Sequence, residues 1–248
     1  MDVQVRAATD IGLVRSTNED RYGLWLPQEP VVRERRGVLL VIADGMGGAR
    51  AGEVASRTAV EKVLESYREA RGEPLEDLRV AMIAANHAVH GESLLHPGRS
   101  GMGTTLTVLV LRGSGAFIAH VGDSRAYLVR GSSARQLTAD HSLVAQLMQA
   151  GYLTPEEARV DPRRNVVTRS VGTAPVVQAD VAPLAEPLRA GDTLLLTTDG
   201  LHGLVSDDEL AAAASDPDLD TVCARLVALA RQRGGPDNIT VVAARIGS

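Results

Sequence analysis

The 248-residue sequence is poor in aromatic residues and in cysteine. Phenylalanine, tyrosine and tryptophan together make up only 2% of the residues, so a core has to be built mainly from Val, Leu, Ile and Ala. The single cysteine, Cys223, excludes a disulfide within the chain and favours a reducing compartment. Because Leu219, Val222 and Leu226 recur around it at helical spacing, we expect Cys223 to be a small core residue of a helix.

The sequence also lacks a long apolar run and an excess of positive charge. No run approaches the roughly 18 residues of a membrane helix, and residues 1–10 do not have the features of a signal peptide, so we expect a cytoplasmic protein. The net charge of −5 argues against nucleic-acid binding. One basic cluster, Arg33, Arg35 and Arg36, is too short for a binding stripe and is expected to be a solvated loop. The length predicts a single domain over residues 1–248.

Strand-like and helix-like segments alternate in groups along the chain. Short turns between several of the strands predict antiparallel pairing. The expected strands are residues 3–8, 22–26, 38–43, 104–111, 116–121, 126–130, 176–182, 193–198 and 239–246. The expected helices are residues 51–70, 75–95, 142–150 and 219–233, with capping boxes at 154–157 and 206–209 that mark two further helix starts. This order predicts an α+β fold, a four-layer αββα sandwich with two central antiparallel sheets flanked by pairs of helices.

Carboxylates lie beside several of the apolar, β-like runs. They are Asp44, Asp123, Asp199 and Asp237, together with the pair Glu19-Asp20. An ionised carboxylate at the end of a buried strand is costly to desolvate, and several such groups repel one another when they converge. Mg²⁺ and Mn²⁺ prefer oxygen ligands in octahedral geometry and would offset such a cluster. The pattern therefore predicts an enzyme that holds divalent cations with carboxylates.

The order and spacing of these residues closely resemble the PP2C-type (PPM family) metal-dependent protein serine/threonine phosphatases of bacterial type. The resemblance runs almost from end to end of the chain. Its motifs are Thr9 to Asp20 (TDxGxxRxxNED), Asp44 to Ser56 (DGMGG continued by AGEVAS), Gly103 to Thr105, Val121 to Arg125 (VGDSR), Leu137 to Ser142 (LTADHS), Thr198 to Leu201 (TDGL) and Asp237 to Thr240 (DNIT). Each motif alone is weak because Asp-Gly pairs are common in turns. Their joint occurrence in this order is specific.

The resemblance implies a reaction and a set of metal ligands. Two ions, Mn²⁺ or Mg²⁺, would share a hydroxide placed for in-line attack on the phosphorus of phosphoserine or phosphothreonine. Asp44 would bridge the ions, with Glu19 and the Gly45 carbonyl on one side and Asp199 and Asp237 on the other. Read alone, Asp44 and Asp199 are turn residues, Asp237 belongs to a connector and Glu19-Asp20 is a solvated loop; their joint occurrence argues for the site.

Three further residues complete the implied site. Asp20 would act mainly through bound water, and Asp123 would hold a weaker third ion together with Asp199. Arg15 would bind the substrate phosphate, because its planar guanidinium matches phosphate oxygens. Read alone, Arg15 is a surface cation.

Two departures from the family pattern bear on the mechanism. Met46 stands where many eukaryotic members carry a histidine that is a candidate general acid, so a bound water would have to protonate the leaving alkoxide. Asp161 precedes Pro162 in the segment that resembles the family's flap, where a His-Pro pair is usual, and this affects how the flap would dock substrate.

The substrates implied are phosphorylated proteins, the targets of a serine/threonine kinase, and the enzyme is expected to be a monomer. An alternative function is that of a catalytically silent pseudophosphatase acting as a binding module, against which the complete ligand set argues. A phosphorylated regulator of the anti-sigma-antagonist type is an alternative substrate. A zinc site at His87 and His90 lacks further ligands nearby in sequence, and a nucleotide loop at Gly47-Gly48 lacks the following Lys-Ser/Thr. His141 is expected to be structural or to support the residues that hold the ions.

Overall fold

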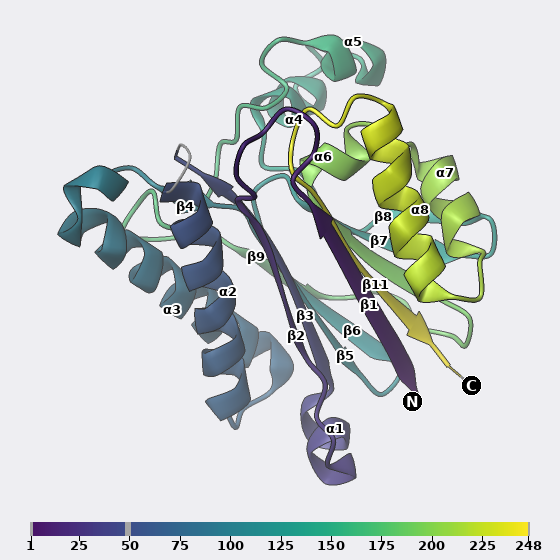
Figure 1. Cartoon of the computed structure of the whole chain (residues 1–248). Coiled ribbons are helices and arrows are strands. Elements are labelled where there is room, and N and C mark those ends of the chain that lie inside the picture. The colour runs from purple at the N-terminus through teal and green to yellow at the C-terminus, as the bar shows by residue number, and fades with distance from the viewer. Residues whose placement is uncertain (1, 48–50, 248) are drawn as a thin grey trace.

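Two antiparallel sheets packed face to face form the centre of the computed structural model, which describes residues 2–47 and 51–247 (Figure 1). Gly48 of the second motif lies outside the described residues. The first sheet has the order β1 (Val3–Asp10), β11 (Ile239–Ile246), β10 (Thr193–Thr197), β7 (Arg125–Arg130), β8 (Ser133–Gln136). The second has the order β2 (Asp20–Trp25), β3 (Val38–Met46), β5 (Leu106–Arg112), β6 (Gly115–Val121), β9 (Asp180–Pro183), and the short β4 (Gly103–Thr104) also pairs with β3.

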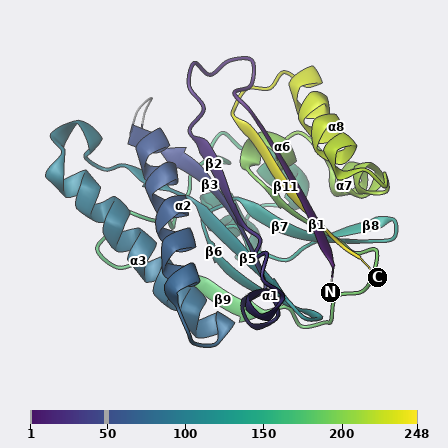
Figure 2. The same ribbon diagram turned by 60° about the horizontal axis from the view of Figure 1, so that its bottom comes forward.

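Helices cover the outer face of each sheet (Figures 1 and 2). The second sheet is covered by α2 (Ala51–Glu69) and α3 (Pro74–Leu95), and the first by α7 (Asp207–Ala214) and α8 (Leu219–Gln232). The remaining helices are α1 (Pro30–Arg36), a 3₁₀ turn (Pro97–Arg99), α4 (Leu143–Gln149), α5 (Pro155–Val160) and α6 (Asp199–His202). Both predicted capping boxes are present, at the starts of α5 and α7.

Three apolar layers follow from the two-residue period of the strands. In β3, Leu39 and Val41 pack toward α2 and α3, whereas Leu40 and Ile42 pack between the two sheets. The third layer lies between the first sheet and its helices and includes Cys223 of α8, which is buried as predicted. The predicted four-layer αββα sandwich is therefore confirmed.

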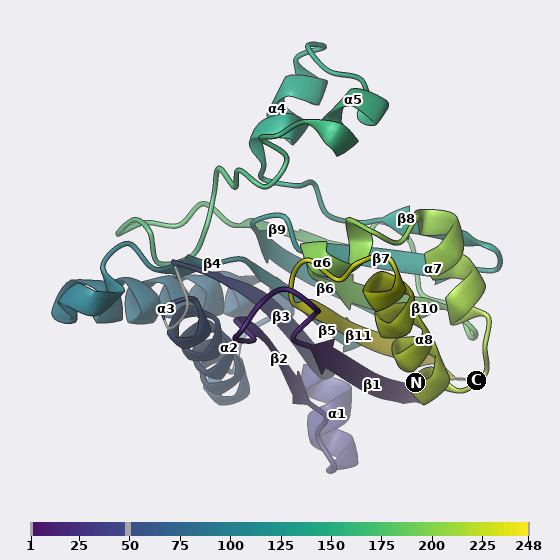
Figure 3. The ribbon, with the colours of Figure 1, turned by 45° about the horizontal axis from the view of Figure 1, so that its top comes forward.

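The strand register brings the acidic motifs to one end of the sandwich. Asp20 is paired directly with Asp44 across β2 and β3. In the other sheet, β10 ends just before Asp199, beside the start of β11 that follows Asp237. The segment of residues 143–166, which carries α4 and α5 and is here called the flap, stands beyond this same end (Figure 3).

Two local predictions were wrong. The expected strand 176–182 is β9 at Asp180–Pro183, because its partner β6 ends at Val121 and Gly122 then turns the chain away with φ of 109°. The basic cluster expected to be a solvated loop lies in α1, where Arg36 is buried. Among the described residues, none of the helices combines the length and the apolarity needed to cross a membrane.

Candidate active site

A pocket of about 330 Å³ opens at the acidic end of the sandwich, between the two sheets and the base of the flap. All of the predicted site residues except Asp20 line it, namely Arg15, Glu19, Asp44, Gly45, Asp123, Asp199 and Asp237. Met46 lines it as well, and the flap side contributes Asn165 and Val167. The structure therefore brings together residues that are separated by more than two hundred positions in the sequence.

Asp44 is held at the end of β3 by its own backbone. Its N–H donates to Thr105 Oγ1 at 2.8 Å, and its carbonyl accepts hydrogen bonds from Thr104 Oγ1 and from the Thr105 N–H at 2.8 and 2.9 Å. The next residue must be glycine, because a Cβ at Gly45 would lie 2.1 Å from the carbonyl oxygen of Gly52. The same Cβ would lie 2.8 Å from the carbonyl oxygen of Glu19, so the turn also packs tightly against the first motif.

Asp20 lies beneath the pocket and is 1% exposed. Its Oδ2 accepts hydrogen bonds from Thr198 Oγ1 at 2.8 Å and from Thr240 Oγ1 at 2.6 Å, while its Oδ1 has no partner among the described residues. These threonines belong to motifs that sequence reasoning had quoted, but it gave them no role. Their hydroxyls donate hydrogen bonds to one carboxyl oxygen of Asp20, a residue that does not line the pocket.

The pKa values of the clustered carboxyl groups are raised. Burial, followed by the charges of neighbouring carboxylates, lifts the pKa of Asp44 well above its ordinary range and also raises that of Asp199. Burial likewise raises the pKa of Asp20 to about 7, although its threonine hydrogen bonds oppose the shift. The pKa of Asp123 is raised to about 7 by burial and then by Asp199. The site thus gathers several carboxyl groups whose ionised forms the surrounding protein does not fully stabilise.

The chemistry of the donor set fits divalent cations. Glu19 Oε1, Asp20 Oδ1 and Asp199 Oδ1 are buried oxygens without a hydrogen-bond partner among the described residues. Such oxygens are costly to leave unsatisfied, and a hard cation satisfies them directly or through its bound water. In the described part of the chain, no three His, Cys, Asp or Glu side chains already stand in a metal-binding arrangement. Arg15 Nη2 donates a hydrogen bond to Asp237 Oδ2 at 2.6 Å. For Asp237 Oδ2 to bind an ion, one of these two side chains has to move.

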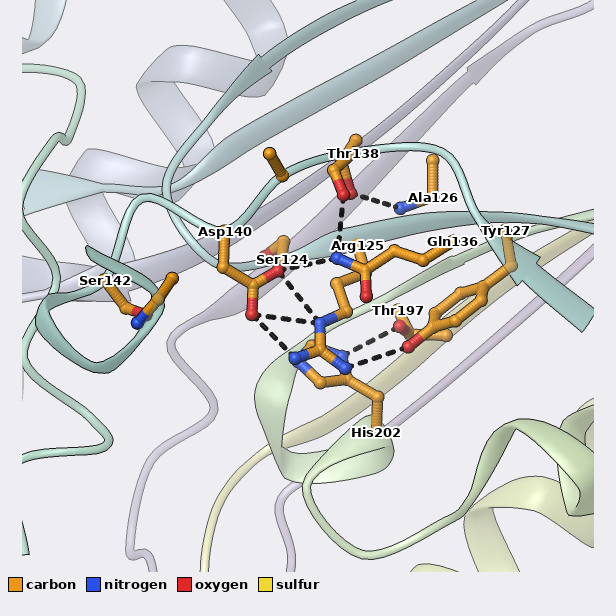
Figure 4. A network of polar contacts seen from close by, with 12 residues as sticks. Ser124, Arg125, Ala126, Tyr127, Gln136, Thr138, Asp140, Ser142, Thr197 and His202 are labelled. Carbon is orange, nitrogen blue, oxygen red and sulfur yellow. Dashed lines mark hydrogen bonds and ion pairs between the residues drawn. The ribbon is translucent and has the colours of Figure 1, made fainter. Parts of the chain in front are cut away.

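Figure 4 shows a polar network that includes Arg125, two residues after Asp123, and His202, three residues after Asp199. The guanidinium of Arg125 donates to both oxygens of Asp140 at 2.6 to 3.1 Å and to Tyr127 Oη at 3.1 Å. In α6, which begins at Asp199, the ring of His202 contacts Thr197 Oγ1 at 2.9 Å. Because Asp140 lies just before the flap, the network ties the flap base to the start of β7. Sequence reasoning quoted Arg125 and Asp140 as motif residues without this role.

Comparison with known proteins agrees with this geometry. The Protein phosphatase 2C family matches residues 15–238. The chain belongs to this family. It is 36% identical over 244 residues to the protein phosphatase PhpP of Streptococcus pneumoniae, covering 96% of both chains. It is 39% identical over 241 residues to the serine/threonine protein phosphatase PstP of Mycobacterium tuberculosis, covering 97% of this chain and 44% of PstP.

Solved structures of protein phosphatase 2C members share the fold. The crystal structure of M. tuberculosis PstP/Ppp has a TM-score of 0.88 at 37% identity and 99% coverage of both chains. The PstP catalytic domain in complex with two manganese ions has a TM-score of 0.85 at 35% identity, again with 99% coverage of both chains. The family assignment and the fold class predicted from the motifs are therefore confirmed. The roles of the individual site residues in this chain stay predictions.

Proposed function

We propose that this protein is an active phosphatase that hydrolyses phosphoserine and phosphothreonine in proteins and requires Mn²⁺ or Mg²⁺. The observation that carries the proposal is the pocket, where buried carboxyl groups with raised pKa values and unpartnered oxygens surround an arginine. A binding module without turnover has no need of such a cluster, since uncompensated buried carboxylates oppose folding. The manganese-bound PstP structure supports the same ligand chemistry in a relative.

The residues expected to hold the ions are Asp44 as the bridge, Glu19 and the Gly45 carbonyl on one side, and Asp199 and Asp237 on the other. When bound, divalent cations supply a water of lowered pKa and stabilise negative charge on the phosphoryl group. Asp20 keeps its hydrogen bonds to Thr198 and Thr240 and acts on bound water rather than as a direct ligand. The hydrogen bonds to the backbone of Asp44 fix this residue at the pocket, which supports its proposed role as the bridge.

Arg15 is placed to bind the substrate phosphate. Its side chain is half-exposed at the pocket and contacts Asp237 Oδ2. When Asp237 serves as a metal ligand, the planar guanidinium can turn its N–H groups to two phosphoryl oxygens and orient the phosphorus for in-line attack. Met46, which also lines the pocket, has no proton to give, so the leaving serine or threonine oxygen takes its proton from water.

A third, weaker ion is proposed beside Asp123. Asp123 and Asp199 line the same pocket, and after burial the charge of Asp199 contributes most to the raised pKa of Asp123, which supports a shared ion. One carboxylate plus one shared ligand leaves most of the coordination shell to water, as suits an exchangeable ion. The substrates are proposed to be targets of a serine/threonine kinase and the enzyme a monomer. Residues 15–17 and flap residue 165 line the same pocket, so a protein segment can contact both.

Hydrolysis of p-nitrophenyl phosphate and of a phosphothreonine peptide tests the function directly. Activity is expected with Mn²⁺ and with Mg²⁺ and is expected to disappear in excess EDTA. Asp123→Ala is expected to keep two tightly bound Mn²⁺ ions in calorimetric titration and to lose most of its activity on the peptide. Wild-type protein that folds and binds Mn²⁺ but hydrolyses neither substrate would instead support a binding module.

A further inference from the structure

A buried amide, Asn238, joins the two ends of the chain beneath the pocket. It is 5% exposed and makes three hydrogen bonds to the backbone of the loop before β2. Its Oδ1 accepts the N–H of Glu19 at 2.8 Å, and its Nδ2 donates to the carbonyls of Ile11 and Thr17 at 2.9 and 3.0 Å. Asn238 does not line the pocket itself.

The side chain at this position has to offer one acceptor and two donors together. A carboxamide supplies that combination, and a flipped amide would face the Glu19 N–H with its own donors. A carboxylate would place an oxygen against two carbonyl oxygens. Removal of the amide would leave three backbone groups without partners, and buried polar groups of this kind are expensive to leave unpaired.

The three bonds enclose the functional part of the loop. The two bonded carbonyls belong to residues before and after Arg15 in the sequence, and the bonded N–H belongs to Glu19. Asp237 is the residue next to Asn238. Elsewhere the two segments are in equally close contact, since a Cβ at Gly12 would lie 2.3 Å from the Asp237 carbonyl oxygen and the Leu13 N–H donates to the Gly235 carbonyl at 2.7 Å.

We infer that Asn238 is a positioning residue, and this inference rests on the proposed function. Asn238 fixes the loop that carries Arg15 and Glu19 relative to Asp237, so that the cation ligands and the phosphate-binding arginine lie at the same pocket. The residue acts through backbone groups and touches neither cation nor substrate. Groups that orient metal ligands from behind typically change metal affinity or activity by about 10–100-fold when they are mutated. The inference therefore predicts a loss of cation affinity beyond any loss of stability.

The chain contains a matched control in Asn86 of α3. This amide is 1% exposed and has the same pattern of three backbone hydrogen bonds. Its Oδ1 accepts the Gly172 N–H at 2.8 Å, and its Nδ2 donates to the carbonyls of Ala174 and Pro175 at 3.0 and 3.2 Å. None of these residues lines the pocket. Truncation of either amide breaks equivalent bonds, but only one of the two loops carries site residues.

The experiment compares Asn238→Ala with Asn86→Ala in the full chain. Mn²⁺ affinity is measured by calorimetric titration, folding by thermal unfolding, and kcat and KM with p-nitrophenyl phosphate. Both variants should lose stability, whereas Asn238→Ala alone should bind Mn²⁺ about 10–100-fold more weakly and show a raised KM. Asn86→Ala should stay within about threefold of wild-type affinity, because its loop holds no ligand.

Equal Mn²⁺ affinities for the two variants would overturn the inference. If Asn238→Ala does not fold, Asn238→Ser, which keeps a polar group in the buried space, is titrated in its place under conditions where it is folded. The same criterion of a tenfold loss applies. A wild-type protein that neither binds Mn²⁺ nor hydrolyses phosphate esters would refute the proposed function itself. That outcome is distinct from the test of Asn238, which compares the Mn²⁺ affinities of two variants of an active enzyme.

Discussion

Arg36 of α1 and Asp77 of α3 form a buried ion pair, whereas Asp20 is buried and Asp44 and Asp199 are partly buried at the acidic end of the sandwich. Figure 1 shows α1 at the end opposite to α6, the helix that begins with Asp199. The Arg36 Nη1 to Asp77 Oδ2 distance is 2.5 Å, and both side chains are less than a tenth exposed. The same guanidinium also donates to the carbonyl of Tyr67 at 2.6 Å. At that end, each buried charge has a partner within the protein.

The carboxyl end lacks such internal compensation. Arg15, which lines the pocket, is half-exposed, and within the described part of the chain its ion pair is with Asp237. Asp20 and Asp123 have pKa values of about 7, raised chiefly by burial. In the unfolded chain, they titrate near pH 4. The folded protein therefore holds these protons more tightly, and the stability of the metal-free fold should fall as the pH rises from about 4 to about 7.

The comparison teaches that one fold can use buried charge for two purposes. The Arg36–Asp77 pair is complete and serves to join α1 to α3, and its loss should affect folding alone. The carboxyl cluster is incomplete without a cation. Mutation of one of its carboxyl groups should reduce activity more than it reduces stability. Mutations at the two ends should therefore separate stability from activity.

The largest effect is expected for Asp44→Asn. This change keeps the shape of the bridging side chain and removes its charge, so turnover of a phosphothreonine peptide should fall at least about 1,000-fold, or roughly 4 kcal/mol in the barrier. Steady-state assays at saturating Mn²⁺ measure it. The variant should still fold, because a repulsive charge has been removed. Near-wild-type turnover in a folded variant would refute the assignment of Asp44.

Asp77→Ala should give the reverse result. The substitution leaves the guanidinium of Arg36 buried without its partner, and breaking a buried pair in this way costs about 3–5 kcal/mol of stability. Urea unfolding measures the loss. At a temperature where the variant remains folded, kcat/KM should equal that of wild type. A large loss of activity without loss of stability would mean that the two ends are coupled.

His120 provides a smaller, pH-dependent test with the opposite sign to that of the carboxyl groups. Burial, and then the neighbouring His141, lowers the pKa of His120 to about 4. The unfolded chain protonates this histidine near pH 6.5, so its contribution to stability is present above that pH and is lost as the pH falls toward 4. The loss amounts to at most about 3 kcal/mol.

The check is urea unfolding of metal-free wild type and His120→Gln between pH 4.5 and 7.5. The difference in unfolding free energy between the two proteins should shrink as the pH falls, because the variant has no imidazole to protonate. A difference that does not change with pH would contradict the assigned pKa.

Sequence patterns predicted the fold and the location of the carboxyl cluster because both depend on local signals. Residues 38–43 are a continuous apolar run, typical of a strand that is buried on both faces, and Asp44 follows directly after it. Antiparallel pairing then brings Asp20 opposite Asp44. The motif order supplied the remaining ligands, although their roles in this chain are still predictions.

The features that could not be predicted depend on partners far away in the sequence. Arg36 looked solvent-exposed because Asp77, which neutralises it, lies 41 positions further on. The hydrogen bonds of Thr198 and Thr240 to Asp20 were not predicted either, because both threonines lie more than 170 positions further on. Long-range pairs of this kind leave no periodic signal in the sequence.

The central claim is that cations, and not protein groups, compensate the buried carboxyl cluster. Thermal unfolding at pH 7.5 in EDTA and in Mn²⁺, with wild type and Asp44→Asn side by side, tests it most directly. Wild type should gain about 2.7 kcal/mol at a Mn²⁺ concentration of 100 times the dissociation constant. Asp44→Asn should be more stable than wild type in EDTA and gain little from Mn²⁺. Wild-type stability that is the same in EDTA and in Mn²⁺ would contradict the account.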